Sequence, residues 1–179
     1  MYNPDLYQKT LLFAAEAHQG QKLPGTELSY LVHLSNVAME VLTAFTKESA
    51  FAIDMDLCMQ AALLHDTLED TAVTFEQLTE VFGSKVAIVV MALTKNADLP
   101  KSERMPDSLD RVVKVGKEAA MVKMADRIVN LQPPPKHWSK EKRIAYKKEA
   151  QLILNKLGTF HKYLSDRLKQ KIKDYQAFC

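Results

Sequence analysis

Signals that start and stop helices recur along this chain, and they constrain its fold more than any other feature of the sequence. Asn3 and Pro4 combine an N-cap side chain with a proline at the first helical position. Thr74 and Gln77 have the spacing of a capping box, and the prolines of "QPPPKHWS" end a helix abruptly. The chain has 5 glycines, and alternating β-branched residues are nearly absent. The sequence therefore predicts an all-α fold, a bundle of roughly eight or nine helices.

These signals, together with apolar periodicity, place the individual helices. We expect helices at about 3–18, 30–45, 54–71, 74–82, 84–93, a short one after Pro106, one at 117–131, and two after Ser139. The segment from Thr94 to Ser108 is polar and contains two prolines, so it is expected to be a long surface loop. No repeat or linker divides the chain, and residues 1–179 are therefore expected to form one domain.

Composition excludes several classes of protein. Hydrophobic residues make up 47% of the chain and charged residues 26%, which is typical of a globular protein rather than a disordered one. The formal net charge of +2 gives no reason to expect a nucleic acid partner. No apolar run approaches the roughly 20 residues of a membrane span, and the N-terminus does not resemble a signal peptide. Because Cys58 and Cys179 make no disulfide framework, we expect a cytoplasmic protein without membrane association.

The segment "AALLHDTLEDT", residues 61–71, begins like a buried helix and ends in a cluster of charge. Asp66, Glu69 and Asp70 closely follow His65. On a continuous helix, residues four apart share a face, so His65 would lie beside Glu69 and Asp66 beside Asp70. Carboxylates gathered at the end of an apolar helix repel one another and lose solvation, so a positive partner is expected. A divalent metal is the simplest partner, because histidine nitrogen and aspartate oxygen together suit Zn, Mn or Fe.

Two other residues can complete such a metal site. His33 lies near the start of an apolar helix in "YLVHLSNVAMEV", and Asp126 is an acidic residue inside the apolar helix of "MVKMADRIVNL". Each of these residues has an ordinary explanation when taken alone: His33 as a satisfied buried histidine, Asp126 as one half of an ion pair. Together with His65 and Asp66 they favour a metal site that leaves positions open for water and substrate.

The order of the motifs resembles that of the HD superfamily of metal-dependent phosphohydrolases. The matching stretches are "AHQGQ" at 17–21, "YLVH" at 30–33, "ALLHDTLEDT" at 62–71, "VFGSKVAIVVMALTK" at 81–95 and "KMADRIVNL" at 123–131. More narrowly, the chain is similar to the hydrolase domain of RelA/SpoT-type enzymes and to small alarmone hydrolases. The resemblance implies an HD-domain helical bundle and a guanosine 3′,5′-bis(diphosphate) 3′-pyrophosphohydrolase, that is, a ppGpp hydrolase of the stringent response.

The resemblance also implies roles for individual residues. His33, His65, Asp66 and Asp126 are expected to bind the metal, usually Mn²⁺, although another divalent ion is possible. Glu69 and Asp70 are the expected catalytic residues, which position and deprotonate the attacking water. A small anionic nucleotide is the expected partner, and basic or polar side chains near the motifs would contact it. The expected substrate-binding residues are Lys22, Tyr30, Lys95, Arg104 and Asn130.

Two alternatives remain open at this level. Relatives usually carry arginine in the loop before the histidine of "YLVH", whereas this chain reads "QKLPGTELSY" and has no arginine there. An HD phosphohydrolase acting on a different nucleotide or phosphoester is therefore one alternative. The other is a non-catalytic module that senses a nucleotide or holds a partner through the basic stretch "RLKQKIKDY". The sequence gives no prediction of oligomeric state.

Overall fold

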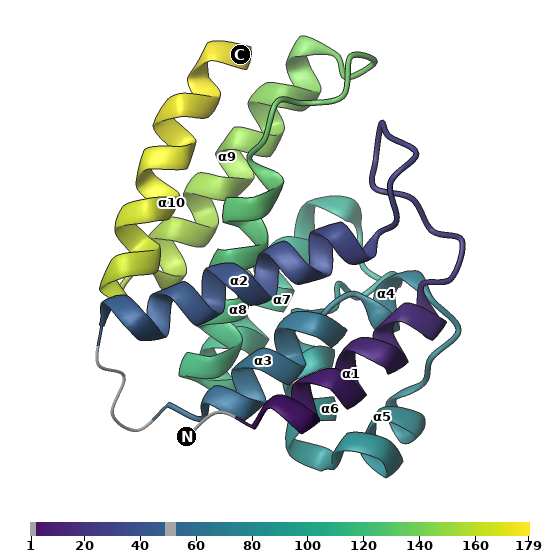
Figure 1. Ribbon diagram of the computed structural model, residues 1–179. Coiled ribbons are helices and arrows are strands. Elements are labelled where there is room, and N and C mark those ends of the chain that lie inside the picture. The colour runs from purple at the N-terminus through teal and green to yellow at the C-terminus, as the bar shows by residue number, and fades with distance from the viewer. Residues whose placement is uncertain (1–2, 49–52) are drawn as a thin grey trace.

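The computed structural model describes residues 3–48 and 53–179, and Figure 1 shows that these residues form a bundle of helices. The prediction of an all-α fold is confirmed: the described residues contain no strand, only an isolated bridge between Lys22 and Ser29. The described residues contain ten α-helices, if the short α4 is counted separately from α3, and a 3-10 helix near the C-terminus. They are α1 Pro4–Ala17, α2 Leu31–Lys47, α3 Met55–Leu64, α4 Thr67–Asp70, α5 Phe75–Phe82, α6 Ser84–Leu93, α7 Lys101–Val115, α8 Lys117–Asn130, α9 Lys140–Leu157, α10 Lys162–Tyr175 and η1 Gln176–Phe178.

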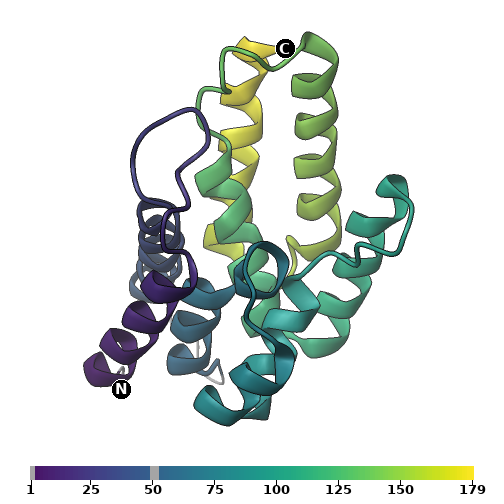
Figure 2. The same cartoon turned by 90° about the vertical axis from the view of Figure 1, so that its right-hand side faces the viewer.

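Helices α3 and α8 form the centre of the bundle. Helix α3 packs against α1, α2, α6 and α8, while α8 also packs against α7, α9 and α10. Every residue from Cys58 to Leu64 and from Ala119 to Ile128 is buried. In the view of Figure 1, helix α2 crosses the molecule, with α1, α3, α5 and α6 below it. Helices α9 and α10 stand side by side above α2 (Figures 1 and 2). Polar groups on α3 and α8 are therefore held inside the protein.

The caps that the sequence indicates are present. The side chain of Asn3 accepts hydrogen bonds at the start of α1, and that of Asp54 accepts the amide of the third residue of α3. Thr74 and Gln77 form the complete capping box of α5, and Ser139 caps α9. Each cap satisfies amide groups that a helix start otherwise leaves without a partner.

The prediction of a surface loop from Thr94 to Ser108 was wrong. Helix α7 begins at Lys101 and contains Pro106 within it. A proline at this position removes one hydrogen bond near the start of the helix, which is a local cost. The helix is stabilised by an apolar stripe at helical spacing, whose members are buried against the core: Met105, Leu109 and Val112. This stripe, rather than the prolines, decides the structure of the segment.

None of the helices in residues 3–48 and 53–179 is long and apolar enough to cross a membrane.

Candidate metal centre

The helix that carries the charged segment is interrupted at the histidine and the first aspartate. Helix α3 ends at Leu64, and α4 begins at Thr67, with Asp66 at φ −102° and ψ −1° between them. The prediction that His65 and Glu69 share one continuous helical face was therefore wrong. Side chains satisfy carbonyls at the end of α3: Oγ1 of Thr67 donates to Leu64 and Nδ1 of His65 contacts the carbonyl of Ala62. The break lets consecutive side chains face the same point, which a regular helix would separate by about 100°.

The four side chains that the sequence singles out do converge. Nε2 of His65 lies 3.0 Å from Oδ2 of Asp66 and 3.7 Å from Oδ1 of Asp126. Nε2 of His33 lies 3.2 Å from Nε2 of His65, 3.6 Å from Asp66 and 3.5 Å from Asp126. The donor atoms of His33, His65 and Asp66 all lie within 4.8 Å of one another. Thus α2 contributes His33, the α3–α4 break contributes His65 and Asp66, and α8 contributes Asp126 to one cluster.

The spacing of these atoms fits a single divalent ion. Ligand atoms bound at about 2.1 Å to one ion are separated by about 3.0 to 3.5 Å, which is close to the distances between these donors. The contact of His65 Nδ1 with the carbonyl of Ala62, at 2.9 Å, requires the proton to be on Nδ1. Nε2 of the neutral ring then has a free lone pair toward the centre, as a metal ligand needs. The residues present therefore fit a metal.

The charges in the cluster also favour a cation. Burial alone would lower the pKa of His65, but the carboxylates of Asp66 and Asp126 raise it well above its ordinary value. The pKa of His33 is raised in the same way, against the effect of burial. Burial opposes ionisation of Asp66, yet His65 and His33 hold its pKa well below the ordinary value. The carboxylates of Asp66, which is half-buried, and of Asp126, which is buried, have lowered pKa values, so both keep their charge and attract positive charge to the centre.

Tyr30 and Asn130, two of the predicted substrate-binding residues, hold the carboxylates of the cluster. The hydroxyl of Tyr30 donates to Oδ2 of Asp66 at 2.5 Å, and Nδ2 of Asn130 donates to Oδ1 of Asp126 at 2.5 Å. Burial and the charge of Asp66 raise the pKa of Tyr30, so the phenol stays protonated and remains a donor. Both residues orient groups that would bind the metal, a task that sequence reasoning did not give them.

Glu69 and Asp70 lie on α4 and have different partners. The backbone amide and the ammonium group of Lys95 each donate to the carboxylate of Glu69 at 3.0 Å. Oδ2 of Asp70 accepts from Nε2 of Gln21 at 3.1 Å. Loss of solvation raises the pKa of Asp70, which makes its carboxylate a stronger base than that of an ordinary aspartate. Lys95, predicted to contact substrate, is thus engaged with Glu69.

The contacts of the other two predicted substrate-binding residues, Lys22 and Arg104, lie outside the cluster. Lys22 is exposed on the loop between α1 and α2. The guanidinium group of Arg104 donates to the carbonyls of Leu99 and Ala97, at 2.9 and 2.7 Å. Arg104 therefore ties together the short connection between α6 and α7 in this structure.

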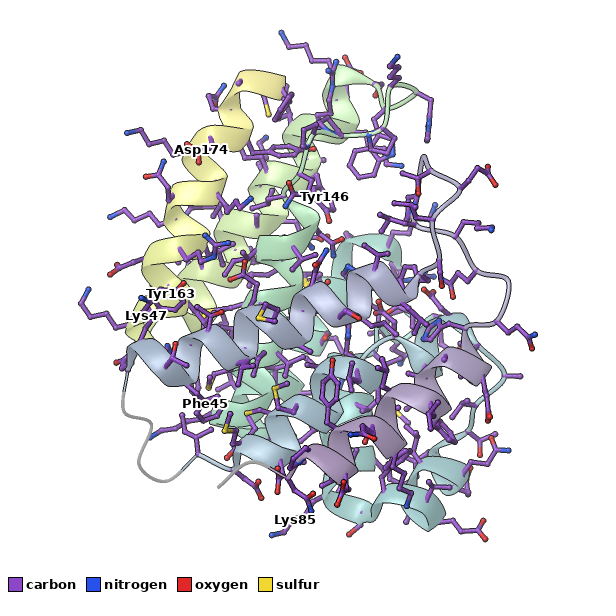
Figure 3. All side chains as sticks on the ribbon, viewed as in Figure 1. Phe45, Lys47, Lys85, Tyr146, Tyr163 and Asp174 are labelled. Atoms are coloured by element: carbon purple, nitrogen blue, oxygen red, sulfur yellow. The ribbon has the colours of Figure 1, made fainter. Side chains whose placement is uncertain are left out.

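A pocket of about 400 Å³ adjoins the cluster, and sequence reasoning did not find it. Its walls come from two loops that meet: a β-carbon added to Gly25 would lie 3.7 Å from Pro135. Tyr146, on α9 in the upper half of Figure 3, also lines the pocket, and its ring lies 5.1 Å from that of Trp138. Other lining residues are Leu23, Pro24, Thr26, His33, Asn130 and Pro133. The segment "QPPPKHWS" signalled only a helix end, so its role as a pocket wall depends on tertiary contacts.

Two buried cations beside the cluster were also not assigned. Nζ of Lys123 donates to the carbonyl of Leu93 at 3.1 Å, and burial lowers the pKa of Lys123. Arg127 pairs with Glu149, and its guanidinium group lies 4.2 Å from the ring centre of Tyr146. The motif "KMADR" places one cation on each side of Asp126, a pattern visible in the sequence but ambiguous without the packing.

Known proteins resemble this chain over most of its length. A family model described as an HD domain matches residues 10–159. The chain is 33% identical over 167 residues to guanosine-3′,5′-bis(diphosphate) 3′-pyrophosphohydrolase MESH1 of Danio rerio, covering 90% of this chain and 89% of the relative. The enzyme of the same name from Homo sapiens is 32% identical over 166 residues, again covering 90% and 89%.

A solved structure also resembles the fold of this chain. It is described as a metazoan orthologue of SpoT that hydrolyses ppGpp and plays a role in starvation responses, and it superposes with a TM-score of 0.82. The identity is 28%, and the match covers 97% of both chains. The motifs, the all-α fold and these likenesses agree, and this chain belongs to the HD domain family.

Proposed function

We propose that this chain is a metal-dependent phosphohydrolase that removes pyrophosphate from the ribose 3′ position of ppGpp. One observation carries the proposal: His33, His65, Asp66 and Asp126 converge on one point, beside α4 and the pocket of about 400 Å³. That volume is within the range of small-molecule sites, about 300 to 1,000 Å³. The named activity of the MESH1 relatives indicates the substrate.

The four converging residues would hold the ion, with Tyr30 and Asn130 fixing the carboxylates that bind it. A divalent ion, when bound, supplies Lewis acidity toward a water molecule and the phosphoryl oxygens. We propose Mn²⁺, since one imidazole pair and one carboxylate pair suit an ion of intermediate softness.

Asp70 is the proposed general base. Its pKa is raised, and Gln21 donates to its Oδ2, so Oδ1 is left to accept a proton from water. The water oxygen bonds to the phosphorus nearest the ribose, and the bond from that phosphorus to the 3′ oxygen breaks. GDP and pyrophosphate are released, the 3′ oxygen takes up a proton from solvent, and Asp70 returns the proton of the attacking water to solvent. Glu69 positions the water and is itself held by Lys95.

Cations around the cluster support an anionic substrate. Lys95 and Arg127 lie close enough to Lys123 to help lower its pKa, after the larger effect of burial. Pairing of Lys95 with Glu69 outweighs its burial and raises its pKa, so it stays charged. Such groups offset the charge of a diphosphate. Lys22 and Arg104 remain proposed contacts for the outer phosphates.

The biological setting follows from the proposed reaction. An enzyme that consumes ppGpp would lower the alarmone signal of a stringent response, and it would meet its substrate in the cytoplasm. Residues 1–179 act as one catalytic domain in this proposal, with a small nucleotide as partner and neither nucleic acid nor membrane.

A second candidate keeps the metal and the water but changes the nucleotide. It is favoured by the wall of the pocket, where Leu23, Pro24 and Thr26 stand on the loop that lacks arginine. This wall offers apolar contact and one hydroxyl, so it discriminates weakly between bases. A different nucleotide bearing a 3′ phosphate or diphosphate is therefore the second substrate class.

The test is hydrolysis by the purified chain with added Mn²⁺. Release of pyrophosphate and GDP from ppGpp is expected, with GTP and adenosine analogues bearing 3′ phosphates as the comparison panel. His65→Ala should lose metal and activity together. If no nucleotide in the panel is hydrolysed with Mn²⁺ or other divalent ions, the chain is a non-catalytic nucleotide-sensing module rather than a hydrolase.

A further inference from the structure

The loop that follows α1 reaches the charged segment through two side chains, His18 and Gln21. Helix α1 ends at Ala17, and His18 is its C-cap. Nδ1 of His18 lies 2.6 Å from Oε1 of Gln21, and Nε2 of Gln21 lies 3.1 Å from Oδ2 of Asp70. His18 is thus connected through Gln21 to Asp70, which lies 49 positions after Gln21 in the chain.

This pair of hydrogen bonds has a fixed direction. Oε1 of an amide only accepts, so His18 must carry its proton on Nδ1 and donate. Nε2 of Gln21 then donates to the carboxylate of Asp70. If the amide flipped, its oxygen would face the carboxylate, and two acceptors would oppose one another. Gln21 therefore presents its amino group to Asp70 and its oxygen to His18, and a proton on Nδ1 of His18 stabilises this orientation.

The surroundings of His18 indicate that it serves this purpose. The side chain is 3% exposed, and its ring lies 5.1 Å from that of Tyr30. Its Nε2 atom is buried and has no hydrogen-bond partner among the described residues. Within the described part of the chain, the bond to Gln21 is therefore the one hydrogen bond of the His18 side chain. A buried imidazole with one unpaired nitrogen lowers the stability of the fold. The remaining hydrogen bond of His18 therefore indicates a role in orienting the amide of Gln21.

We propose that Gln21 is a positioning residue for Asp70 and that His18 acts through Gln21 by fixing the orientation of its amide. The inference rests on the proposed function, in which Asp70 takes a proton from water. Gln21 donates to Oδ2 of Asp70, which leaves Oδ1 to accept the proton of the attacking water. Neither Gln21 nor His18 contacts substrate or metal in this arrangement, so both influence the rate of the chemical step rather than binding.

The main test replaces Gln21 with methionine, which is similar in length but cannot donate. Gln21→Met should lower kcat by roughly ten- to a hundredfold, because a small misplacement of a reacting group costs this much. KM for ppGpp and the Mn²⁺ content should remain within about twofold of wild type. Gln19→Met is the matched control: Gln19 is exposed on the same turn, and its substitution should leave kcat unchanged.

A second set of variants tests His18. His18→Asn keeps a donor near the position of Nδ1 and should retain most of the wild-type kcat, whereas His18→Leu should lose as much as Gln21→Met. The double variant with His18→Leu and Gln21→Met should be no worse than Gln21→Met alone, because both act through one bond. If His18→Leu does not fold, His18→Asn and Gln21→Met still carry the test. Multiplicative losses in the double variant would overturn the coupling.

A crystal structure of Gln21→Met separates this inference from the proposed function. The carboxylate of Asp70 should leave the position it has in wild type, and it should keep that position in Gln19→Met. An unmoved Asp70, or an active wild type with a Gln21→Met variant of equal kcat, would overturn the inference and leave the proposed hydrolase intact. A moved Asp70 in a protein without hydrolase activity would support the contact and contradict the hydrolase.

Discussion

The hydroxyl of Tyr30 donates to Oδ2 of Asp66 at 2.5 Å, and the same oxygen lies 3.0 Å from Nε2 of His65. Tyr30, at the end of the loop between α1 and α2, thus holds a carboxylate of the metal centre through a hydrogen bond. The ring of Tyr30 also lies 5.1 Å from the rings of both His18 and His33. Tyr30 therefore connects the first loop with the metal centre.

Removal of the Tyr30 hydroxyl should weaken metal binding. Tyr30→Phe keeps the ring packing and frees Oδ2 of Asp66, and loss of such an outer partner typically costs about 10- to 100-fold in metal affinity. Competition with a chelator measures the Mn²⁺ affinity. Tyr163→Phe, on α10 in Figure 3, is the control and should bind as wild type. Equal affinity in Tyr30→Phe and wild type would show that the hydroxyl does not hold a metal ligand.

Lys95 should matter for the rate of hydrolysis far more than for stability. The side chains of Lys95 and Glu69 are 35% and 30% exposed, and ion pairs of this kind contribute at most about 1 kcal/mol to unfolding free energy. Lys95→Met should reduce kcat by at least about tenfold, since Glu69 loses its side-chain partner. Thermal unfolding and steady-state kinetics measure the two effects. Lys85→Met, an exposed lysine of α6, should change neither, and a Lys95→Met variant with normal kcat would remove Lys95 from the account.

The metal centre should make stability depend on pH in opposite ways with and without metal. The folded-state pKa values of His33 and His65 are raised, so in metal-free protein their protonation contributes stability that is complete below about pH 6.5. This contribution is lost as pH rises through the raised values. Asp66 has a lowered pKa, and its contribution is lost below about pH 4.

Metal competes with those protons. Mn²⁺ should therefore bind more tightly as pH rises, with release of protons from the histidines. Melting temperatures should fall from pH 6 to pH 9 without metal and show the opposite trend, or none, with saturating Mn²⁺. Calorimetry in buffers of different ionisation enthalpy measures the protons released. Metal binding without proton release at pH 6.5 would contradict the raised pKa values.

Trp138 should determine how tightly the nucleotide binds. Its ring is part of the pocket wall, and Nζ of Lys142 lies 4.1 Å from its centre. Loss of aromatic stacking on a base typically costs about 1 to 3 kcal/mol, so Trp138→Ala should raise KM for ppGpp by about 5- to 150-fold with little change in kcat. Phe178→Ala, an aromatic change that faces Tyr175 near the C-terminus, serves as the control. An unchanged KM in Trp138→Ala would place the base elsewhere.

Many helix starts in this chain can be predicted from local signals, whereas the predictions around Pro106 and Asp66 were wrong. Capping side chains such as Asn3, Thr74 and Ser139 specify helix starts within a few residues, so the sequence alone indicates where helices begin. Pro106 gave the wrong boundary, because burial of Met105 and Leu109 outweighs a lost hydrogen bond. The break at Asp66 was missed although its side-chain hydrogen bonds are local, each joining residues three positions apart.

The residues of the site also divide into those that the sequence indicates and those that only the fold brings together. The types and order of His33, His65, Asp66 and Asp126 indicate a metal centre, because these residues are costly inside apolar helices. The partners of these groups do not follow from sequence. Tyr30, Gln21 and the two loops around Trp138 meet the centre only after the chain has folded.

Hydrolysis of ppGpp in water enriched in ¹⁸O tests the central claim most directly, with Mn²⁺ and the wild-type chain. If a water held beside Asp70 attacks the phosphorus nearest the ribose, one ¹⁸O atom appears in pyrophosphate and none in GDP, and His65→Ala gives no products. Labelled orthophosphate, label in GDP, or no turnover of ppGpp at all would contradict the proposed 3′-pyrophosphohydrolase.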